Sequence, residues 1–159
     1  MTMDMSNTVV ATASAMTANL GPLAKISLRF SEMVEERATG KGCTEADWAP
    51  VGELVATDKF ERIGAYLEVM TWKEYVKFLT QWAGSTRFES TVKRISEIGR
   101  VVFYEIEERH YKGDDFIRKN VIAVYEFDDK NKIRHLDIYE QAKDSGRWIV
   151  EAAEAARVK

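Results

Sequence analysis

Residues 86–141 read TRFESTVKRISEIGRVVFYEIEERHYKGDDFIRKNVIAVYEFDDKNKIRHLDIYEQ, and this stretch decides the fold. Its β-branched and aromatic runs are separated by turn signals at Gly99, at Lys112–Asp115 and at Asp128–Asn131. Strand-forming runs joined by turns that contain Gly and Asp are typical of consecutive antiparallel hairpins. Because helical patterns fill the first half of the chain, the sequence predicts an α+β domain with its helices first and a β-meander second.

Three helical patterns precede the meander. The first, over residues 22–38, begins at a Gly-Pro pair and repeats apolar residues at helical spacing. The second, over residues 44–56, opens with a Thr-x-x-Asp capping pattern, and the third, over residues 71–83, opens with a Thr-x-x-Glu capping box. Residues 59–67 read as one strand between them, and the alanine-rich residues 148–158 read as a C-terminal helix.

Length and composition indicate one globular domain. The chain has 159 residues, of which 45% are hydrophobic and 31% charged, and its formal net charge is −3. We interpret residues 1–20 as a flexible N-terminal arm and residues 21–159 as the domain. A nearly balanced charge without a basic stripe argues against a nucleic-acid partner. No segment is long and apolar enough to predict a membrane span, so no membrane partner is expected.

The cysteine and histidine content predicts no metal site. Cys43 is the only cysteine, which excludes an internal disulfide and a thiolate cluster. His110 and His135 are the only histidines, too few for a typical zinc or non-haem iron site. The N-terminal residues lack the basic start and apolar core of a signal peptide, so the prediction is a cytoplasmic protein.

Two sequence patterns resemble a known superfamily. The pair DW at residues 47–48, followed by LVATDKF at residues 54–60, resembles the helix-to-strand hallmark of the nuclear transport factor 2-like superfamily. The stretch FDDKNKI at residues 127–133 is similar to the start of the closing hairpin of SnoaL-like proteins. The resemblance covers roughly residues 22–141, and its motifs form turns and caps, so it speaks to fold more than to activity.

The resemblance implies a cone, in which a strongly curved antiparallel sheet wraps three helices and encloses an apolar pocket. Superfamily members include ketosteroid isomerase, scytalone dehydratase, limonene epoxide hydrolase, polyketide cyclases and non-catalytic binders. Their enzymes mostly work without a cofactor, through side chains that protrude from the concave face of the sheet into the pocket.

The catalytic residues of ketosteroid isomerase are not matched in this chain. By an ungapped match, the positions of its oxyanion-hole Asp, its helix-one Tyr and its base Asp hold Ala123, Phe30 and Ile63. The resemblance therefore does not imply that isomerase's own chemistry.

Limonene epoxide hydrolase matches at one catalytic position only. Ile106 stands where that enzyme has its Arg, and Ile138 stands where it has its second Asp. Glu108 is the acidic counterpart of its first Asp, so the triad is absent as a set while one acidic position is kept.

The turns fix an expected strand register. If Gly113-Asp114 is a two-residue tip, the opposed pairs are Lys112 with Asp115, Glu108 with Lys119, Ile106 with Val121, and Tyr104 with Ala123. A four-residue tip over residues 128–131 pairs Phe127 with Lys132, Ala123 with Leu136, Val121 with Ile138, and Lys119 with Glu140. One face is then apolar and continues into charged residues, as a pocket wall would.

This register gives the candidate site residues. The expected substrate-binding residues are apolar or aromatic: Phe30, Tyr66, Trp72, Tyr104, Ile106, Val121, Ala123, Leu136 and Ile138. The expected catalytic residues can carry or accept a proton: Glu108, His110, Lys119 and Glu61. A one-residue register shift would bring His135 and Asp137 into the pocket instead.

Each candidate has a purely structural alternative. Glu108, Lys119 and Glu140 also fit a cross-strand row of ion pairs at the rim of the sheet. Aromatic residues at helical spacing are more often core than ligand cage. His110 lies near a turn, where exposed histidines are common.

The opposite face of the sheet predicts self-association. Val101, Phe103, Ile122 and Val124 alternate onto this outer face and form an apolar patch. A patch of this kind is typical of a homodimer interface, so a homodimer is expected.

Two functions remain open. The favoured hypothesis is a cofactor-independent lyase or isomerase that moves a proton on a hydrophobic, aromatic or polycyclic small molecule. The alternative is a non-catalytic module of the same fold that binds a hydrophobic ligand or another protein. Two or more titratable groups converging on one ligand position would favour the enzyme.

Overall fold

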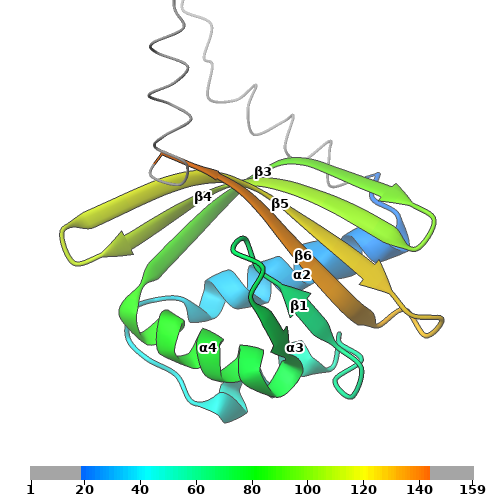
Figure 1. Ribbon diagram of the computed structural model, residues 1–159, viewed down its shortest axis with the longest axis horizontal. Coiled ribbons are helices and arrows are strands. Elements are labelled where there is room, and N and C mark those ends of the chain that lie inside the picture. Colours follow the sequence, from blue (N-terminus) through cyan, green and yellow to red (C-terminus); the bar gives the residue numbers. More distant parts are fainter. Residues whose placement is uncertain (1–18, 144–159) are drawn as a thin grey trace, which may run out of the picture.

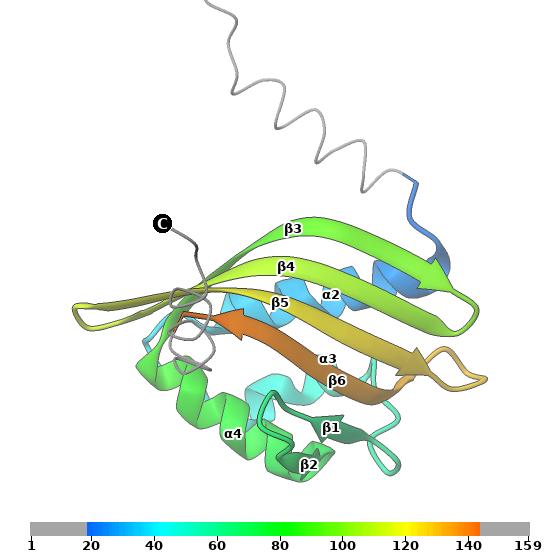
Figure 2. The same ribbon diagram turned by 45° about the horizontal axis from the view of Figure 1, so that its top comes forward.

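Four long antiparallel strands form most of the sheet in the computed structural model, which describes residues 19–143. They are β3 (Arg87–Ile98), β4 (Val101–Lys112), β5 (Asp115–Phe127) and β6 (Ile133–Ala142). Two short strands, β1 (Glu61–Ile63) and β2 (Val69–Thr71), extend the sheet in the order β2-β1-β6-β5-β4-β3. The sheet arches over the helices and does not close on itself (Figures 1 and 2).

The helices pack against the concave side of this arch (Figure 1). They are α2 (Pro22–Arg37), the 3₁₀ helix η1 (Glu45–Trp48) that runs into α3 (Ala49–Gly52), and α4 (Trp72–Ser85). Both predicted capping boxes are present, because Thr44 and Thr71 exchange hydrogen bonds with Asp47 and Glu74 respectively. Helices are thus found where all three were expected, and the middle one is half 3₁₀.

The first turn of α2 is capped by a residue far away in sequence. Gly21, at the N-cap position, offers no side chain, and the carboxylate of Glu97 on β3 takes over that role. Its two oxygens accept hydrogen bonds of 3.2 Å from the backbone N–H groups of Leu23 and Ala24. A helix whose own sequence lacks a cap is therefore closed by the end of a strand.

The predicted register of the β4–β5 hairpin is confirmed. Lys112 pairs with Asp115, Glu108 with Lys119, and Tyr104 with Ala123. Gly113 begins the two-residue tip with φ of 59°, a conformation that glycine adopts without a Cβ penalty.

The predicted register of the β5–β6 hairpin is wrong by two residues. Ala123 pairs with Ile138, Val121 with Glu140, and Lys119 with Ala142. The tip is longer than expected, with Asn131 at φ of 59°, and the ladder shifts between Glu126 and Phe127. Because side chains alternate with a period of two, a slip of two keeps every residue on its expected face.

The predicted strand over residues 59–67 is only three residues long. The chain turns after Ile63, and Leu67 takes a positive φ of 65° before β2 pairs back on β1. β1 runs parallel to β6, so the sheet is mixed and not wholly antiparallel. The parallel alignment starts earlier, where Ala56 donates to the Ile133 carbonyl and Ile133 donates to that of Leu54.

Some expectations fall outside the structure. The proposed C-terminal helix over residues 148–158 and nearly all of the N-terminal arm lie beyond the described residues. Within residues 19–143, no helix has the length and apolar character needed to cross a membrane.

Candidate functional site

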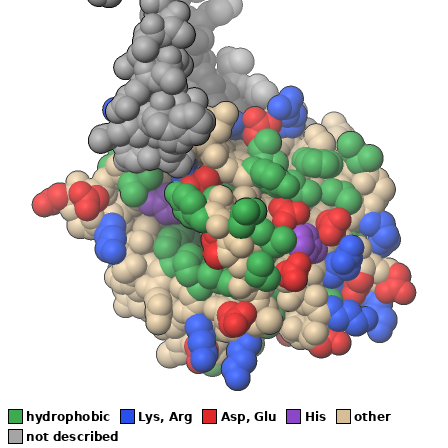
Figure 3. Space-filling view, viewed as in Figure 1, with side chains coloured by type: hydrophobic (Ala, Val, Ile, Leu, Met, Phe, Trp, Pro, Cys, Tyr) green, Lys and Arg blue, Asp and Glu red, His purple; other side chains and the backbone are tan. Residues whose placement is uncertain are grey.

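A cavity of about 360 Å³ lies between α4 and the concave face of the sheet. The α4 side is aromatic and aliphatic, with Tyr75, Phe78, Leu79 and Trp82 in successive turns. Figure 3 shows hydrophobic side chains gathered over the middle of this face of the molecule, with acidic and histidine side chains among them and further charged side chains at the margin. This size and lining suit a small, largely apolar molecule that is oriented by a few polar groups.

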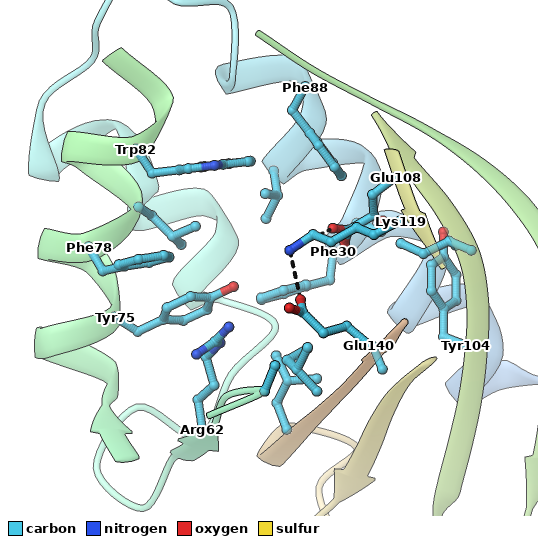
Figure 4. Close-up of a pocket in the computed structure, with 18 of the residues that line it drawn as sticks. Phe30, Arg62, Tyr75, Phe78, Trp82, Phe88, Tyr104, Glu108, Lys119 and Glu140 are labelled. Carbon is cyan, nitrogen blue, oxygen red and sulfur yellow. Dashed lines mark hydrogen bonds and ion pairs between the residues drawn. The ribbon is translucent and has the colours of Figure 1, made fainter. Parts of the chain in front are cut away.

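A row of four ionisable side chains projects into this cavity from β4, β5 and β6. His110 Nε2 lies 2.9 Å from Glu108 Oε2, and Lys119 Nζ lies 3.9 Å from the same oxygen. Lys119 Nζ also lies 2.7 Å from Glu140 Oε2, the ion pair drawn in Figure 4. Glu108 thus contacts an imidazole and an ammonium group, and Glu140 holds that ammonium group in place.

Two aromatic rings lie beside the imidazole of His110. The Phe88 ring centroid is 5.1 Å from that of His110, and the Trp82 ring centroid is 6.0 Å away. These rings limit the movement of the imidazole and keep water from part of its surface. His110 therefore belongs to the cavity and not to an exposed turn.

Arg62 enters the cavity from β1. Its guanidinium carbon lies 5.0 Å from the ring centroid of Tyr75 and 5.7 Å from that of Phe78. Figure 4 shows the Arg62 guanidinium group and the Tyr75 hydroxyl pointing into the same space as Lys119 and Glu140. Polar groups from three strands and one helix therefore converge inside an apolar shell.

Three tyrosines of the cavity have raised pKa values. Burial raises the pKa of Tyr75, although the nearby charge of Arg62 works against the rise. Burial raises the pKa of Tyr104 to about 12, while a hydrogen bond with Ser31 opposes it. Burial also raises the pKa of Tyr125 well above its ordinary value. All three hydroxyls are therefore neutral at physiological pH and can act as hydrogen-bond donors.

The structure brings most of the candidate residues together. The cavity is lined by Glu108, His110 and Lys119, and by Phe30, Tyr66, Tyr104, Ile106, Ala123, Leu136 and Ile138. Glu61, Trp72 and Val121 do not line it. His135 and Asp137 lie on the outer face, where His135 Nδ1 is 3.5 Å from Glu61 Oε1 and Nε2 is 3.0 Å from Asp137 Oδ1.

Each of the three candidates that do not line the cavity has a physical reason for its position. Glu61 faces outward because it pairs with His135 across the parallel β1–β6 ladder, which turns Arg62 inward. Trp72 packs edge-on against Phe60 at the start of α4. Val121 lies opposite Glu140, and that glutamate supplies the wall there.

Sequence reasoning missed several lining residues. Arg62 is not among the sequence candidates, because no short-range pattern fixes which way the side chains of a three-residue strand face. Tyr75 and Trp82 were assigned to core packing, although their spacing on one face of α4 also fits a pocket wall. Glu140 was placed in the charged row but not among the catalytic candidates.

The site offers acid–base chemistry through its own side chains. Glu108 and Glu140 can accept protons, and Arg62, Lys119 and Tyr75 can donate hydrogen bonds to a developing negative charge. Within residues 19–143, no group of three or more His, Cys, Asp or Glu side chains is arranged to hold a metal ion.

No family model and no curated protein matches the sequence. Solved structures do match in fold. An LEH-like epoxide hydrolase of M. tuberculosis is 17% identical with a TM-score of 0.59, over 82% of this chain and 94% of that one. A SnoaL-like polyketide cyclase, so named, from Shewanella putrefaciens CN-32 is 10% identical with a TM-score of 0.62, over 90% and 94%.

A third match carries the superfamily name. A nuclear transport factor 2-like protein from Cytophaga hutchinsonii is 13% identical with a TM-score of 0.55, over 77% of this chain and 93% of that one. These likenesses confirm the fold that the sequence resemblance implied.

Proposed function

For a chain with the nuclear transport factor 2-like cone fold, we propose cofactor-independent proton transfer on a hydrophobic, aromatic or polycyclic small molecule. The reaction class is that of a lyase or isomerase. The observation that carries the proposal is the pairing of Glu108 with His110, 2.9 Å apart, inside a cavity with an aromatic wall. A carboxylate hydrogen-bonded to an imidazole within an apolar shell is a typical arrangement for a general base.

The first step proposed is removal of a proton from carbon beside a carbonyl group. Glu108 takes the proton, and the electron pair of the broken C–H bond moves toward the carbonyl oxygen. Lys119, held by Glu140 at 2.7 Å, supplies positive charge for that oxygen. Return of the proton to another carbon gives isomerisation, and loss of a leaving group gives elimination.

The wall opposite the charged row supports a flat substrate. Tyr75, Phe78 and Trp82 project from one side of α4 toward the sheet. Aromatic side chains favour planar ligands through stacked and edge-on contacts. A bicyclic or tricyclic ring system matches the cavity of about 360 Å³.

The second candidate is a non-catalytic ligand binder. One observation favours it: Glu108, Lys119 and Glu140 already satisfy one another as ion pairs. In that case the row stabilises the rim of the cone, and the cavity holds a hydrophobic ligand without changing it.

Hydrogen–deuterium exchange at carbon separates these two functions. Bicyclic to tetracyclic ketones, with 2-tetralone as the first, are incubated with the protein in D2O, and loss of the α-proton signal is followed by NMR. A proton-transfer enzyme accelerates this exchange, and Glu108→Gln slows it by about two orders of magnitude or more.

The matched control is Glu107→Gln, the same change at the neighbouring residue, whose ion pairs lie on the outer face. It should exchange at the wild-type rate. If the ketones quench the tryptophan fluorescence of the protein but their protons do not exchange, the protein is a binder of these ketones. Equal exchange rates for wild type and Glu108→Gln would remove Glu108 from the mechanism.

A further inference from the structure

Arg62 is a buried cation with little counter-charge. It is 9% exposed, and its Nε is buried without a hydrogen bond to any other residue of the described part of the chain. Burying a guanidinium group is costly unless its N–H groups find acceptors. The Tyr75 and Phe78 rings lie beside the guanidinium group, and Nη1 donates a 3.4 Å hydrogen bond to Glu68, so Nε is the N–H group left without an acceptor among the described residues.

The nearest carboxylate to Arg62 pairs with it only weakly. Glu68 Oε1 lies 3.4 Å from Nη1 of Arg62, and the Glu68 side chain is 40% exposed. Glu68 is anchored elsewhere, because its Oε2 accepts a 3.0 Å hydrogen bond from the Tyr66 backbone N–H. Because Glu68 lies at the solvent-exposed mouth of the cavity, it neutralises at most one side of the guanidinium group.

The other acids of the cavity are paired more closely with other groups. Glu140 is 2.7 Å from Lys119, and Glu108 is 2.9 Å from His110. Among the described residues, the half-exposed Glu68 is therefore the one ion-pair partner of Arg62.

We propose that Arg62 and the hydroxyl of Tyr75 form an anion subsite, so that the ligand is a flat aromatic molecule with a carboxylate group. This inference deepens the proposed function and depends on it only in taking the same cavity as the substrate site. A carboxylate is planar and accepts two parallel N–H bonds from a guanidinium group, which would give Arg62 the second acceptor that its unpaired Nε–H lacks. The Tyr75 hydroxyl, neutral at physiological pH, donates a further bond.

The subsite also fixes how the ligand lies. Arg62 and Tyr75 come from β1 and α4, and they face the Lys119–Glu140 pair across the open space in Figure 4. A carboxylate held at Arg62 leaves the ring system between the aromatic wall of α4 and the sheet. The reacting carbon then faces the charged row, and the anion is the handle that orients it.

Binding of a matched ligand pair tests the subsite without any turnover. 2-Naphthoate and its neutral analogue 2-naphthamide are titrated into the full chain by calorimetry and by tryptophan fluorescence. The naphthoate should bind at least about tenfold more tightly to wild type, since charge-assisted bidentate pairing contributes that much or more. Arg62→Gln should reduce the affinity for naphthoate to that for naphthamide.

Two further variants keep the test decisive. Arg62→Lys keeps the charge but loses the planar fork, and should fall between wild type and Arg62→Gln. Arg134→Gln removes an exposed arginine of β6 that pairs with Glu126, and should bind naphthoate as wild type does. Thermal melts establish that each variant is folded, and the wild-type comparison of the two ligands stands even if Arg62→Gln does not fold.

The outcomes distinguish this inference from the proposed function. If naphthoate binds through Arg62 and no ketone exchanges its proton, the subsite stands and proton transfer on these ketones is ruled out. Equal affinities of wild type for naphthoate and naphthamide overturn the subsite, whether or not ketones exchange.

Discussion

Glu107 and Glu108 are neighbours on β4 that face opposite sides of the sheet. Their side chains are similarly exposed, at 22% and 17%. Glu107 lies 3.1 Å from Arg109 and 2.9 Å from Arg118 on the outer face, whereas Glu108 faces His110 and Lys119 in the cavity. Burial alone therefore does not distinguish a structural carboxylate from a reactive one. The groups that surround each carboxylate make the distinction.

The same contrast is found on β5, where Arg118 pairs with Glu107 on the outer face and Lys119 lies near Glu108 in the cavity. Lys119→Met leaves Glu108 and Glu140 close together without their shared cation, and Glu140 is almost fully buried. We expect the free energy of unfolding to fall by about 2–3 kcal/mol, a loss reduced from that of a fully buried pair because Lys119 is partly exposed. Urea denaturation measures the change.

Arg118→Met is the matched control for this prediction, since its side chain is 62% exposed. Its loss should be no more than about 1 kcal/mol. Adding Glu140→Gln to Lys119→Met should restore much of the stability, because the repulsion disappears. Equal losses for Lys119→Met and Arg118→Met would show that the inner row is an ordinary surface ion pair.

Residues on the two faces of the sheet should also affect the stability of the fold at opposite ends of the pH range. Burial raises the pKa of Tyr104, on the inner face, from 10.0 to about 12. A raised pKa gives stability that is complete below pH 10 and is lost as the pH rises through about 12. The loss amounts to about 2–3 kcal/mol, and Tyr104→Phe should make this alkaline limb shallower in melting temperatures taken from pH 9 upward, with Tyr75 and Tyr125 accounting for the part that stays.

Glu107 on the outer face acts at the acid end. Burial works to raise its pKa, but the hydrogen bond from Arg109 and the charge of Arg118 outweigh burial and hold the pKa below its ordinary value. Its contribution is therefore present at neutral pH and lost as the pH falls below 4.5 through the lowered pKa. Glu107→Gln should flatten the acid limb and leave the alkaline limb unchanged. A variant with the opposite pattern would contradict the assignment of the faces.

Much of this contrast follows from sequence patterning, and the rest follows from long-range pairing. The β4–β5 register could be predicted because Gly113 fixes a two-residue turn, and that register separates Glu107 from Glu108. The β5–β6 register could not, because a bulge beside Phe127 and a longer tip shift it by two residues. The face on which each side chain of these strands lies was still predicted correctly, because a slip of two residues preserves the alternation of side chains between the two faces.

Arg62 shows where local patterns fail. Its strand has three residues, and what turns Arg62 inward is the parallel pairing of β1 with β6, which lies more than seventy residues later in the chain. No turn connects these two strands directly, so no turn chemistry sets their register. Glu61 was accordingly expected in the cavity, and the structure places Arg62 there instead.

The outer face carries the prediction of a homodimer, which stays a prediction. Phe103 and Ile122 are 41% and 39% exposed on that face, beside the less exposed Val101 and Val124. Ile122→Lys places a charge in this patch and should weaken dimerisation at least about tenfold. Sedimentation equilibrium at micromolar concentrations measures it, with Ile117→Lys on the β4–β5 hairpin as control. A wild-type chain that is monomeric at high micromolar concentration rules out this interface.

Added salt should produce the smallest change in the free energy of unfolding. The ion pairs of Glu107 are screened by about 1 M NaCl, whereas those inside the cavity are shielded from solvent ions. The stability difference between wild type and Glu107→Gln should therefore vanish in high salt. The difference between wild type and Lys119→Met should persist.

The carboxylate of Glu97 that closes α2 has a consequence for the order of folding. The contacts to Leu23 and Ala24 span 74 and 73 residues, so we expect the first turn of α2 to be completed only after β3 has formed. Because α2 carries Phe30 into the cavity, we expect one wall of the ligand site to be consolidated late on the folding pathway. Amide exchange at Leu23 and Ala24 should accordingly follow the opening of the β3–β4 hairpin rather than the fraying of an independent helix end.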